Sequence, residues 1–109
     1  MRARTLVPGG LVAAVAVAAV AAVPAESATT SVSVKDNVFA PKSKTVERGT
    51  TVRFVWRGRA AHNVVISGPR RASSAIQVKG TYRFKATKKG LYKVVCTLHP
   101  GMEMKLRAR

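Results

Sequence analysis

Apolar residues recur at every second position in several short runs, and this alternation constrains the fold more than any other feature of the sequence. In the run 51–56, Val52, Phe54 and Trp56 fall on one side and the residues between them on the other. A period of two is typical of strands with one buried face, because successive side chains of a strand point to opposite sides. The same pattern occurs at residues 32–34, 82–85, 92–96 and 104–108. The sequence therefore predicts an all-β chain.

Residues that favour turns separate these runs. They stand at Asp36-Asn37, Pro41, Gly49, Gly58, Gly68-Pro69, Gly80 and Gly90. Seven or eight short strands in such a small domain favour an antiparallel sandwich or barrel. The segment 67–74, SGPRRASS, is polar and basic and is predicted to be a loop.

The first 28 residues differ in composition from the rest. Arg2 and Arg4 precede an unbroken run of Leu, Val and Ala, and small residues follow it. This layout is typical of a secretory signal peptide, with cleavage after Ala25 or Ala28. The run is shorter than the roughly 20 residues that a spanning helix needs, and an uncleaved anchor is the alternative. We expect a signal peptide over residues 1–28 and an exported domain over residues 29–109, located in the periplasm, on the cell surface or outside the cell.

The chain is strongly basic, with 20 Lys and Arg against 4 Asp and Glu and a net charge of +16. Such a surface attracts anionic partners such as acidic proteins, membrane head groups or cell-wall polymers. Nucleic acid is not expected as a partner, because the sequence has no recognition helix, zinc-finger spacing or row of stacking aromatic residues. The basic residues are spread along the domain, so a solvated basic surface is an equally good interpretation.

The only cysteine and one of the two histidines lie in the segment CTLHPGM, residues 96–102. One cysteine cannot form an internal disulfide, so Cys96 is a buried thiol, half of an intermolecular bridge or a metal ligand. His99 and Met102 follow it at intervals of three residues. His62, the other histidine, opens a predicted strand that a sandwich can bring beside this segment. Two histidines, a cysteine and a methionine are the donors of blue-copper electron-transfer sites.

Each of these residues has an ordinary structural interpretation when it is taken alone. A lone cysteine is most often a small buried hydrophobe, and a lone methionine fills a core. The copper interpretation is favoured because every His and Cys of the chain falls where one copper site needs it. Met104 competes with Met102 as the fourth ligand. Its alternation with Leu106 and Ala108 instead favours a role as the first core residue of the last strand.

The chain resembles the cupredoxins, in particular those of the plastocyanin and amicyanin type. The matching residues are Phe39-x-Pro41, Gly49, Val52-x-Phe54-x-Trp56, His62-Asn63-Val64-Val65, Gly80-x-Tyr82-x-Phe84, Gly90-x-Tyr92-x-Val94-x-Cys96, His99 and Met102. The resemblance implies a Greek-key β-sandwich of seven to eight strands and one type 1 copper ion. It implies His62, Cys96, His99 and Met102 as the copper ligands. It also implies that Asn63 joins the two ligand loops by hydrogen bonds.

The resulting hypothesis is a small exported blue (type 1) copper protein that carries single electrons between redox partners. The alternative is an extracytoplasmic protein that binds or sequesters copper without a dedicated electron-transfer partner. An enzyme is not expected, because a copper oxidase or reductase needs a further copper site and both histidines are already used. We expect a monomer with no membrane span in its mature form. The basic surface would steer the redox partner if that partner is acidic.

Overall fold

The computed structural model describes residues 28–109, so residues 1–27 of the predicted signal peptide lie outside the described part. The described residues form nine strands and no helix. The strands are β1 (Thr29–Lys35), β2 (Val38–Ala40), β3 (Ser43–Val46), β4 (Thr51–Trp56), β5 (Val65–Ser67), β6 (Ala72–Ser73), β7 (Thr81–Lys85), β8 (Gly90–Val95) and β9 (Glu103–Ala108). Over residues 28–109, no helix is long and apolar enough to cross a membrane.

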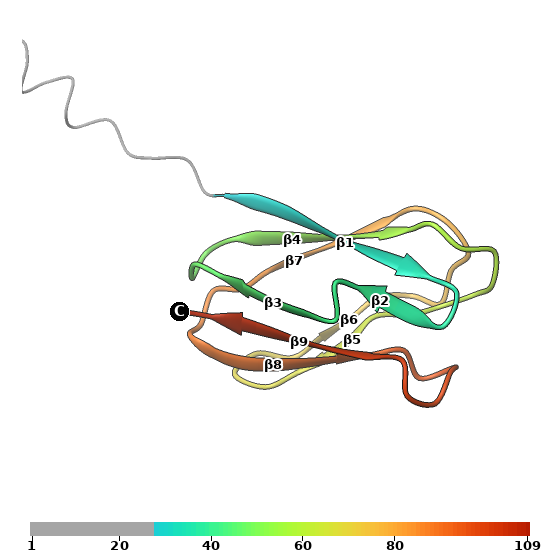
Figure 1. Ribbon diagram of the computed structural model, residues 1–109. Coiled ribbons are helices and arrows are strands. Elements are labelled where there is room, and N and C mark those ends of the chain that lie inside the picture. Colours follow the sequence, from blue (N-terminus) through green and yellow to red (C-terminus); the bar gives the residue numbers. More distant parts are fainter. Residues whose placement is uncertain (1–27) are drawn as a thin grey trace, which may run out of the picture.

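The strands form two sheets packed face to face (Figure 1). The first sheet has the strand order β2-β1-β4-β7, and the second has the order β3-β9-β8-β5-β6. This arrangement confirms the predicted Greek-key β-sandwich. The described part has nine strands where seven or eight were predicted. One reason is β6, which covers two residues in the segment predicted to be a loop, and two residues are too few to show an alternation.

Two strand pairs are parallel, although the sequence predicted an antiparallel arrangement. β1 lies parallel to β4, and β3 lies parallel to β9. Parallel neighbours need a long crossover connection. Between β1 and β4, the chain makes this connection by entering the opposite sheet as β3 before it returns to the first sheet as β4. Because β1 and β4 run in the same direction, the last residues of both strands lie at the same end of the sandwich. The register pairs Val34 with Trp56 close to that end.

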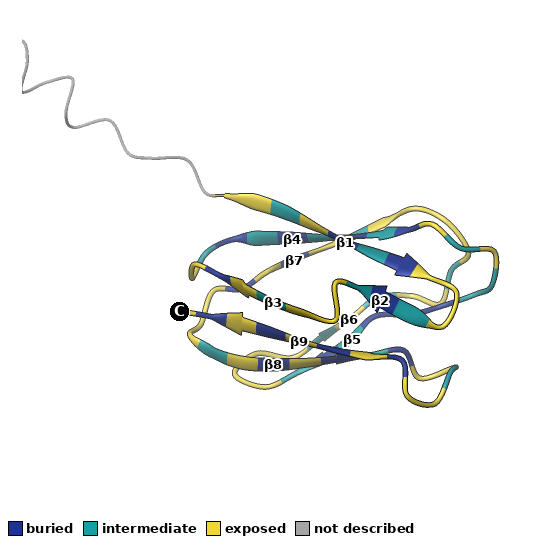
Figure 2. Cartoon of the chain, viewed as in Figure 1, coloured by how far each residue is buried: buried dark blue, intermediate teal, exposed yellow. Residues whose placement is uncertain are grey.

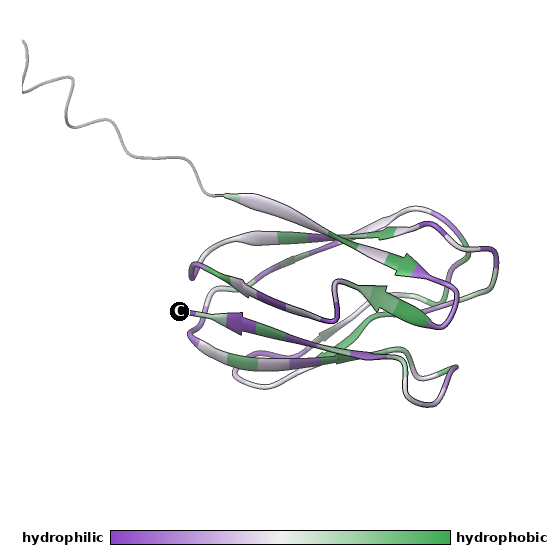
Figure 3. Cartoon of the chain, in the orientation of Figure 1, coloured by the Kyte–Doolittle hydropathy of each residue, from purple (hydrophilic) through white to green (hydrophobic). Residues whose placement is uncertain are grey.

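The core lies between the sheets and follows the alternation of the sequence. Figure 2 shows buried residues alternating with exposed ones along the strands, and Figure 3 shows the matching alternation of hydropathy along β9. In β4, Val52, Phe54 and Trp56 are buried, as predicted. The rings of Phe84 and Tyr92 meet edge to face across the core at 5.3 Å between centroids, a favourable aromatic arrangement.

Two connections meet at the end of the sandwich opposite the C-terminus (Figure 1). One is the segment 57–64, which links β4 in the first sheet to β5 in the second. The other is the segment 96–102, which links β8 to β9. All the predicted ligands and Asn63 belong to these two connections.

Candidate metal centre

The segment 96–102 forms a short loop that is closed by its own backbone. The N–H of Cys96 donates to the carbonyl of Met102 at 3.0 Å, and the N–H of Met102 donates to the carbonyl of His99 at 3.1 Å. Gly101 has a φ of 82°, in the left-handed region that glycine adopts without steric cost. Cys96 and Met102 are buried at the base of the loop, whereas His99 is half-buried.

His62 is held in place by the connection between the two sheets. Its backbone N–H and carbonyl exchange two hydrogen bonds of 3.0 Å with Gln77. The indole N–H of Trp56 donates to the carbonyl of His62 at 3.2 Å. The residue has no exposed surface at all. Its imidazole is therefore fixed inside the sandwich, beneath the loop that carries Cys96.

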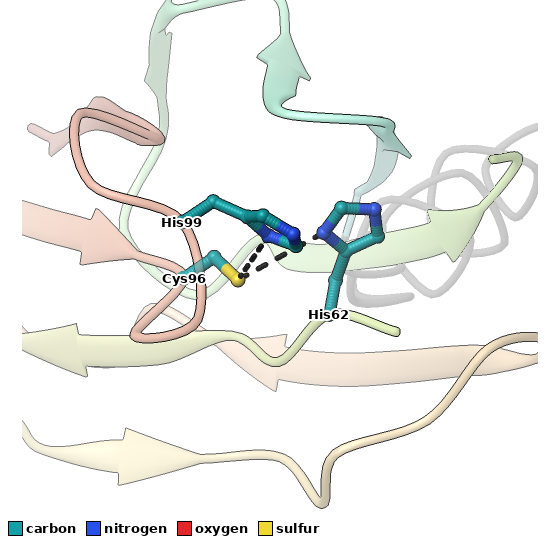
Figure 4. A group of neighbouring side chains, drawn as sticks. All are labelled: His62, Cys96 and His99. Carbon is teal, nitrogen blue, oxygen red and sulfur yellow. Dashed lines mark hydrogen bonds between the residues drawn. The ribbon is translucent and has the colours of Figure 1, made fainter. Parts of the chain in front are cut away.

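The structure brings His62, Cys96 and His99 together, and Figure 4 shows their side chains converging. The ligand atoms of the three residues all lie within 4.8 Å of one another. Sγ of Cys96 lies 3.8 Å from Nδ1 of His62 and 3.5 Å from Nδ1 of His99. The centroids of the two imidazole rings are 4.7 Å apart. Each histidine therefore presents Nδ1 to the sulfur, and its Nε2 points away from the sulfur.

These spacings fit a bound metal ion. In zinc sites, metal–sulfur bonds measure about 2.3 Å and metal–nitrogen bonds about 2.0 Å. With an angle of about 120° between such bonds, the sulfur and nitrogen atoms stand about 3.7 Å apart. The observed separations of 3.8 and 3.5 Å lie on either side of this value. A thiolate and two imidazoles are donors that suit copper, and they stand near ligand spacing without any rearrangement of the chain.

Met102 and Met104 differ in which residue they face. The strand register pairs Met104 with Val94 and Glu103 with Val95, and the hydrogen bond from Cys96 to Met102 continues this register by one more step. Residues that lie opposite each other have Cβ atoms about 5 Å apart. The Met102 side chain is therefore the neighbour of the Cys96 side chain. Met104 lies one full period of the strand deeper in the core, where it is also buried.

Asn63 links the two connections through a reciprocal pair of hydrogen bonds. Its side-chain amide donates to Oγ1 of Thr97 at 2.9 Å. In return, the backbone N–H of Thr97 donates to Oδ1 of Asn63 at 2.9 Å. Because Thr97 follows Cys96 and Asn63 follows His62, these two bonds fix the position of one ligand loop relative to the other.

Asp36 contacts the site, although the sequence predicts only a turn at this position. It follows β1, and its Oδ1 lies 3.0 Å from Nε2 of His62. The backbone N–H groups of Arg59 and Ala60 also donate to the carboxylate, at 2.9–3.0 Å. These backbone hydrogen bonds, together with the one from His62, lower the pKa of Asp36 to about 2. No sequence spacing connects residues 36 and 62, and only the scarcity of acidic residues singles Asp36 out.

The fold and the donor set together define a class: a small β-sandwich that can hold one metal ion at one end through a cysteine and two histidines. The chain belongs to the family of the cupredoxin-like domain, which matches residues 10–107. Its His, Cys, His and Met residues are positioned to bind one copper ion. No curated protein matches the chain.

Solved structures with this fold include copper proteins. A Cu-containing nitrite reductase from Thermus scotoductus SA-01 is 27% identical with a TM-score of 0.67, over 78% of this chain but only 23% of the reductase. The oxidized form of plastocyanin from Dryopteris crassirhizoma is 25% identical with a TM-score of 0.64, over 72% of this chain and 99% of plastocyanin. The reduced Cu(I) form of an amicyanin variant is 24% identical with a TM-score of 0.65, over 82% and 88% of the two chains, and it indicates the fold alone.

Proposed function

We propose that this chain is a small exported blue copper protein that carries single electrons between redox partners. His62, Cys96, His99 and Met102 would be its copper ligands. The observation that carries the proposal is the convergence of one sulfur and two Nδ1 atoms within 4.8 Å, inside a fold shared with plastocyanin. When bound, copper would supply one-electron chemistry by alternating between Cu(I) and Cu(II).

The protein itself supports this proposal, because it holds the proposed ligands Cys96 and His62 in fixed positions. Cys96 and His62 are 4% and 0% exposed, and both are fixed by backbone hydrogen bonds. A site held in one geometry by its surroundings needs little rearrangement when its charge changes. Burial also keeps water away from the thiolate. Met102, opposite Cys96, is the fourth donor that we propose, and Met104 is assigned to the core.

His99 gives this buried site a contact with the outside. It is half-buried, and its neighbours Leu98, Pro100 and Gly101 are exposed. A partner that docks on this loop would meet the edge of the His99 ring. Redox encounters use small interfaces and weak binding, and a loop of this size is sufficient for such an encounter. We expect the partner to be a protein, and the basic surface would favour an acidic one.

The remaining parts of the proposal concern the state of the protein in the cell. We propose that residues 1–28 are a signal peptide that exports the domain to the periplasm, the cell surface or the medium. The mature domain, residues 29–109, would be a monomer without a membrane span. We do not assign an enzymatic activity, because the chain spans 23% of the nitrite reductase and one copper site uses both of its histidines.

The test is an optical and electron paramagnetic resonance spectrum of the purified protein after addition of one equivalent of Cu(II). We expect an intense blue thiolate-to-copper band and a narrow copper hyperfine splitting. Both should disappear in Cys96→Ala and persist in Met104→Leu, which changes a buried sulfur away from the ligand loop. A pale, ordinary Cu(II) spectrum in all three proteins would sink the proposal.

A second measurement separates an electron carrier from a copper store. The copper-loaded protein is titrated repeatedly between its oxidized and reduced states, and the free copper is measured after each cycle. A carrier cycles reversibly and retains its metal. Progressive release of copper on reduction would favour the alternative, a protein that binds or sequesters copper.

A further inference from the structure

A carboxylate touches the imidazole that is most deeply buried in the site. Asp36 is about half exposed, and its Oδ1 lies 3.0 Å from Nε2 of His62, whose side chain is 0% exposed. This is the only contact in the described part of the chain between an acidic side chain and one of the two histidines. It joins the turn after β1 to the connection after β4.

The contact decides which nitrogen of His62 carries the proton. An ionised carboxylate can only accept a hydrogen bond, so the Nε2–H of His62 must be the donor. The lone pair of the neutral ring is then on Nδ1, the atom that faces Sγ of Cys96 at 3.8 Å. A bond to an ionised acceptor is stronger than one to a neutral carbonyl. The imidazole is therefore set in the form that a metal ion requires.

The chain around Asp36 is shaped to hold this carboxylate. Arg59 and Ala60 donate backbone N–H groups to it, and both residues precede His62 in the same connection. A Cβ atom at Gly58 would lie 2.3 Å from Oδ1 and 2.7 Å from Cγ of Asp36. Gly58 does not have the positive φ of the other turn glycines. Glycine is therefore needed at position 58 because Asp36 occupies the space that a side chain would need, and not because of the backbone conformation.

We propose that Asp36 is a positioning residue for His62, which it holds as the Nε2–H tautomer with Nδ1 free for the metal, and that Gly58 makes room for it. The copper part of this inference rests on the proposed function, whereas the tautomer part applies to the metal-free protein. With copper bound, the negative charge beyond the His62 ring stabilises Cu(II) relative to Cu(I). Asp36 therefore lowers the reduction potential and tightens the binding of Cu(II).

Two variants test the inference in different ways. Asp36→Asn keeps the shape of the side chain and removes its charge. Gly58→Ala keeps the carboxylate, but the added Cβ would also lie 2.8 Å from the backbone N of Asp36, so we expect the whole residue to move away from His62. Glu47→Gln is the matched control, because it removes one negative charge from a carboxylate that is bonded to Arg109 and has no contact with either histidine.

The first readout needs no copper. The ring nitrogens of His62 are observed by ¹⁵N nuclear magnetic resonance in the metal-free protein at pH about 8. We expect a single Nε2–H tautomer in the parent protein and in Glu47→Gln. We expect a mixture of tautomers in Asp36→Asn and in Gly58→Ala. An unchanged Nε2–H tautomer in both variants would overturn the inference.

The second readout is the copper affinity and the reduction potential of the copper-loaded protein. Loss of an outer partner of a metal-binding histidine typically weakens metal binding by about 10- to 100-fold. We expect a loss of this size, with a raised reduction potential, in Asp36→Asn and Gly58→Ala but not in Glu47→Gln. Equal potentials in all variants would contradict the copper part. A tautomer change in a protein that forms no blue site would refute the proposed function and leave the positioning role of Asp36 intact.

Discussion

Met102 lies opposite Cys96, while Met104 lies opposite Val94. The two methionines have the same chemistry and nearly the same burial, so position alone distinguishes them. The alternation of Met104 with Leu106 and Ala108 predicts that Met104 is the first core residue of the last strand, and it therefore favours Met102 as the ligand. The structure adds where the loop closes, which alternation alone does not specify.

Replacing each methionine with leucine tests this assignment. In Met102→Leu we expect a raised reduction potential, because the axial donor tunes the potential of a blue-copper site. Removal of a ligand destabilises Cu(II) more than Cu(I). Met104→Leu should leave the potential unchanged and cost less than about 1.5 kcal/mol of unfolding free energy, as volume-conserving core changes do. The opposite result, with only Met104→Leu changing the potential, would make Met104 the ligand.

The Asn63 side chain makes two hydrogen bonds of 2.9 Å to Thr97. In Asn63→Ala we expect a loss of about 1–3 kcal/mol in unfolding free energy, because the N–H of Thr97 loses its acceptor. Copper affinity should fall about 10- to 100-fold. Denaturant unfolding and a competitive copper titration measure the two effects.

Thr97→Val is the matched control for Asn63→Ala. It removes only the bond to the Thr97 hydroxyl and keeps the bond from the backbone N–H. Thr97→Val is therefore expected to lose less unfolding free energy and less copper affinity than Asn63→Ala. Equal and negligible effects of both changes would mean that the two ligand loops hold their positions without this link.

Most elements could be predicted from the sequence, because each has a buried face that repeats every second residue. The runs 51–56 and 92–96 correspond closely to β4 and β8. The parallel pairing of β1 with β4 could not be predicted, since an alternating pattern does not specify the direction or identity of the neighbouring strand. The contact between Asp36 and His62 follows from that pairing and was missed for the same reason.

Gly68 follows β5 at a point where two strands come close. It has a φ of 130°, and a Cβ atom there would lie 2.6 Å from the carbonyl oxygen of Leu91. Gly68→Ala should therefore cost more than the about 1–3 kcal/mol that backbone strain alone imposes. The change in unfolding free energy, from denaturant unfolding of the metal-free protein, is the measurement.

Gly49 gives the matched control for Gly68. Its φ is 93°, and nothing lies within 4 Å of an added Cβ atom. Gly49→Ala should show the cost of backbone strain alone. If the two substitutions destabilise the protein equally, the close approach to β8 contributes nothing to the requirement for glycine at Gly68.

At the scale of the whole molecule, charge is the dominant property. The three acidic residues in the described part of the chain are all engaged: Asp36 with His62, Glu47 with Arg109, and Glu103 with Lys93. The excess of Lys and Arg is therefore not offset by free carboxylates in residues 28–109. A positive field of this kind speeds the approach of anions and is weakened by salt.

The rate of oxidation by an anionic reagent such as hexacyanoferrate(III) should show this field. We expect the second-order rate constant of the reduced copper protein to fall as ionic strength rises from about 0.01 to 0.15 M, where the Debye length shrinks from about 30 to 8 Å. A cationic cobalt complex should show the opposite trend. Stopped-flow absorbance of the blue band measures both, and rates that do not depend on salt would contradict the prediction.

The parallel register of β1 and β4 also predicts which changes of chain length the protein tolerates. A strand advances about 3.3 Å per residue. A shift of this size is as large as the whole 3.0 Å distance between Oδ1 of Asp36 and Nε2 of His62. A single inserted or deleted residue in β1 would therefore move Asp36 out of contact, or turn its side chain to the other face. Natural length variation in related chains should consequently avoid the second half of β1. It should gather instead in segments that neither pair with β4 nor carry a ligand.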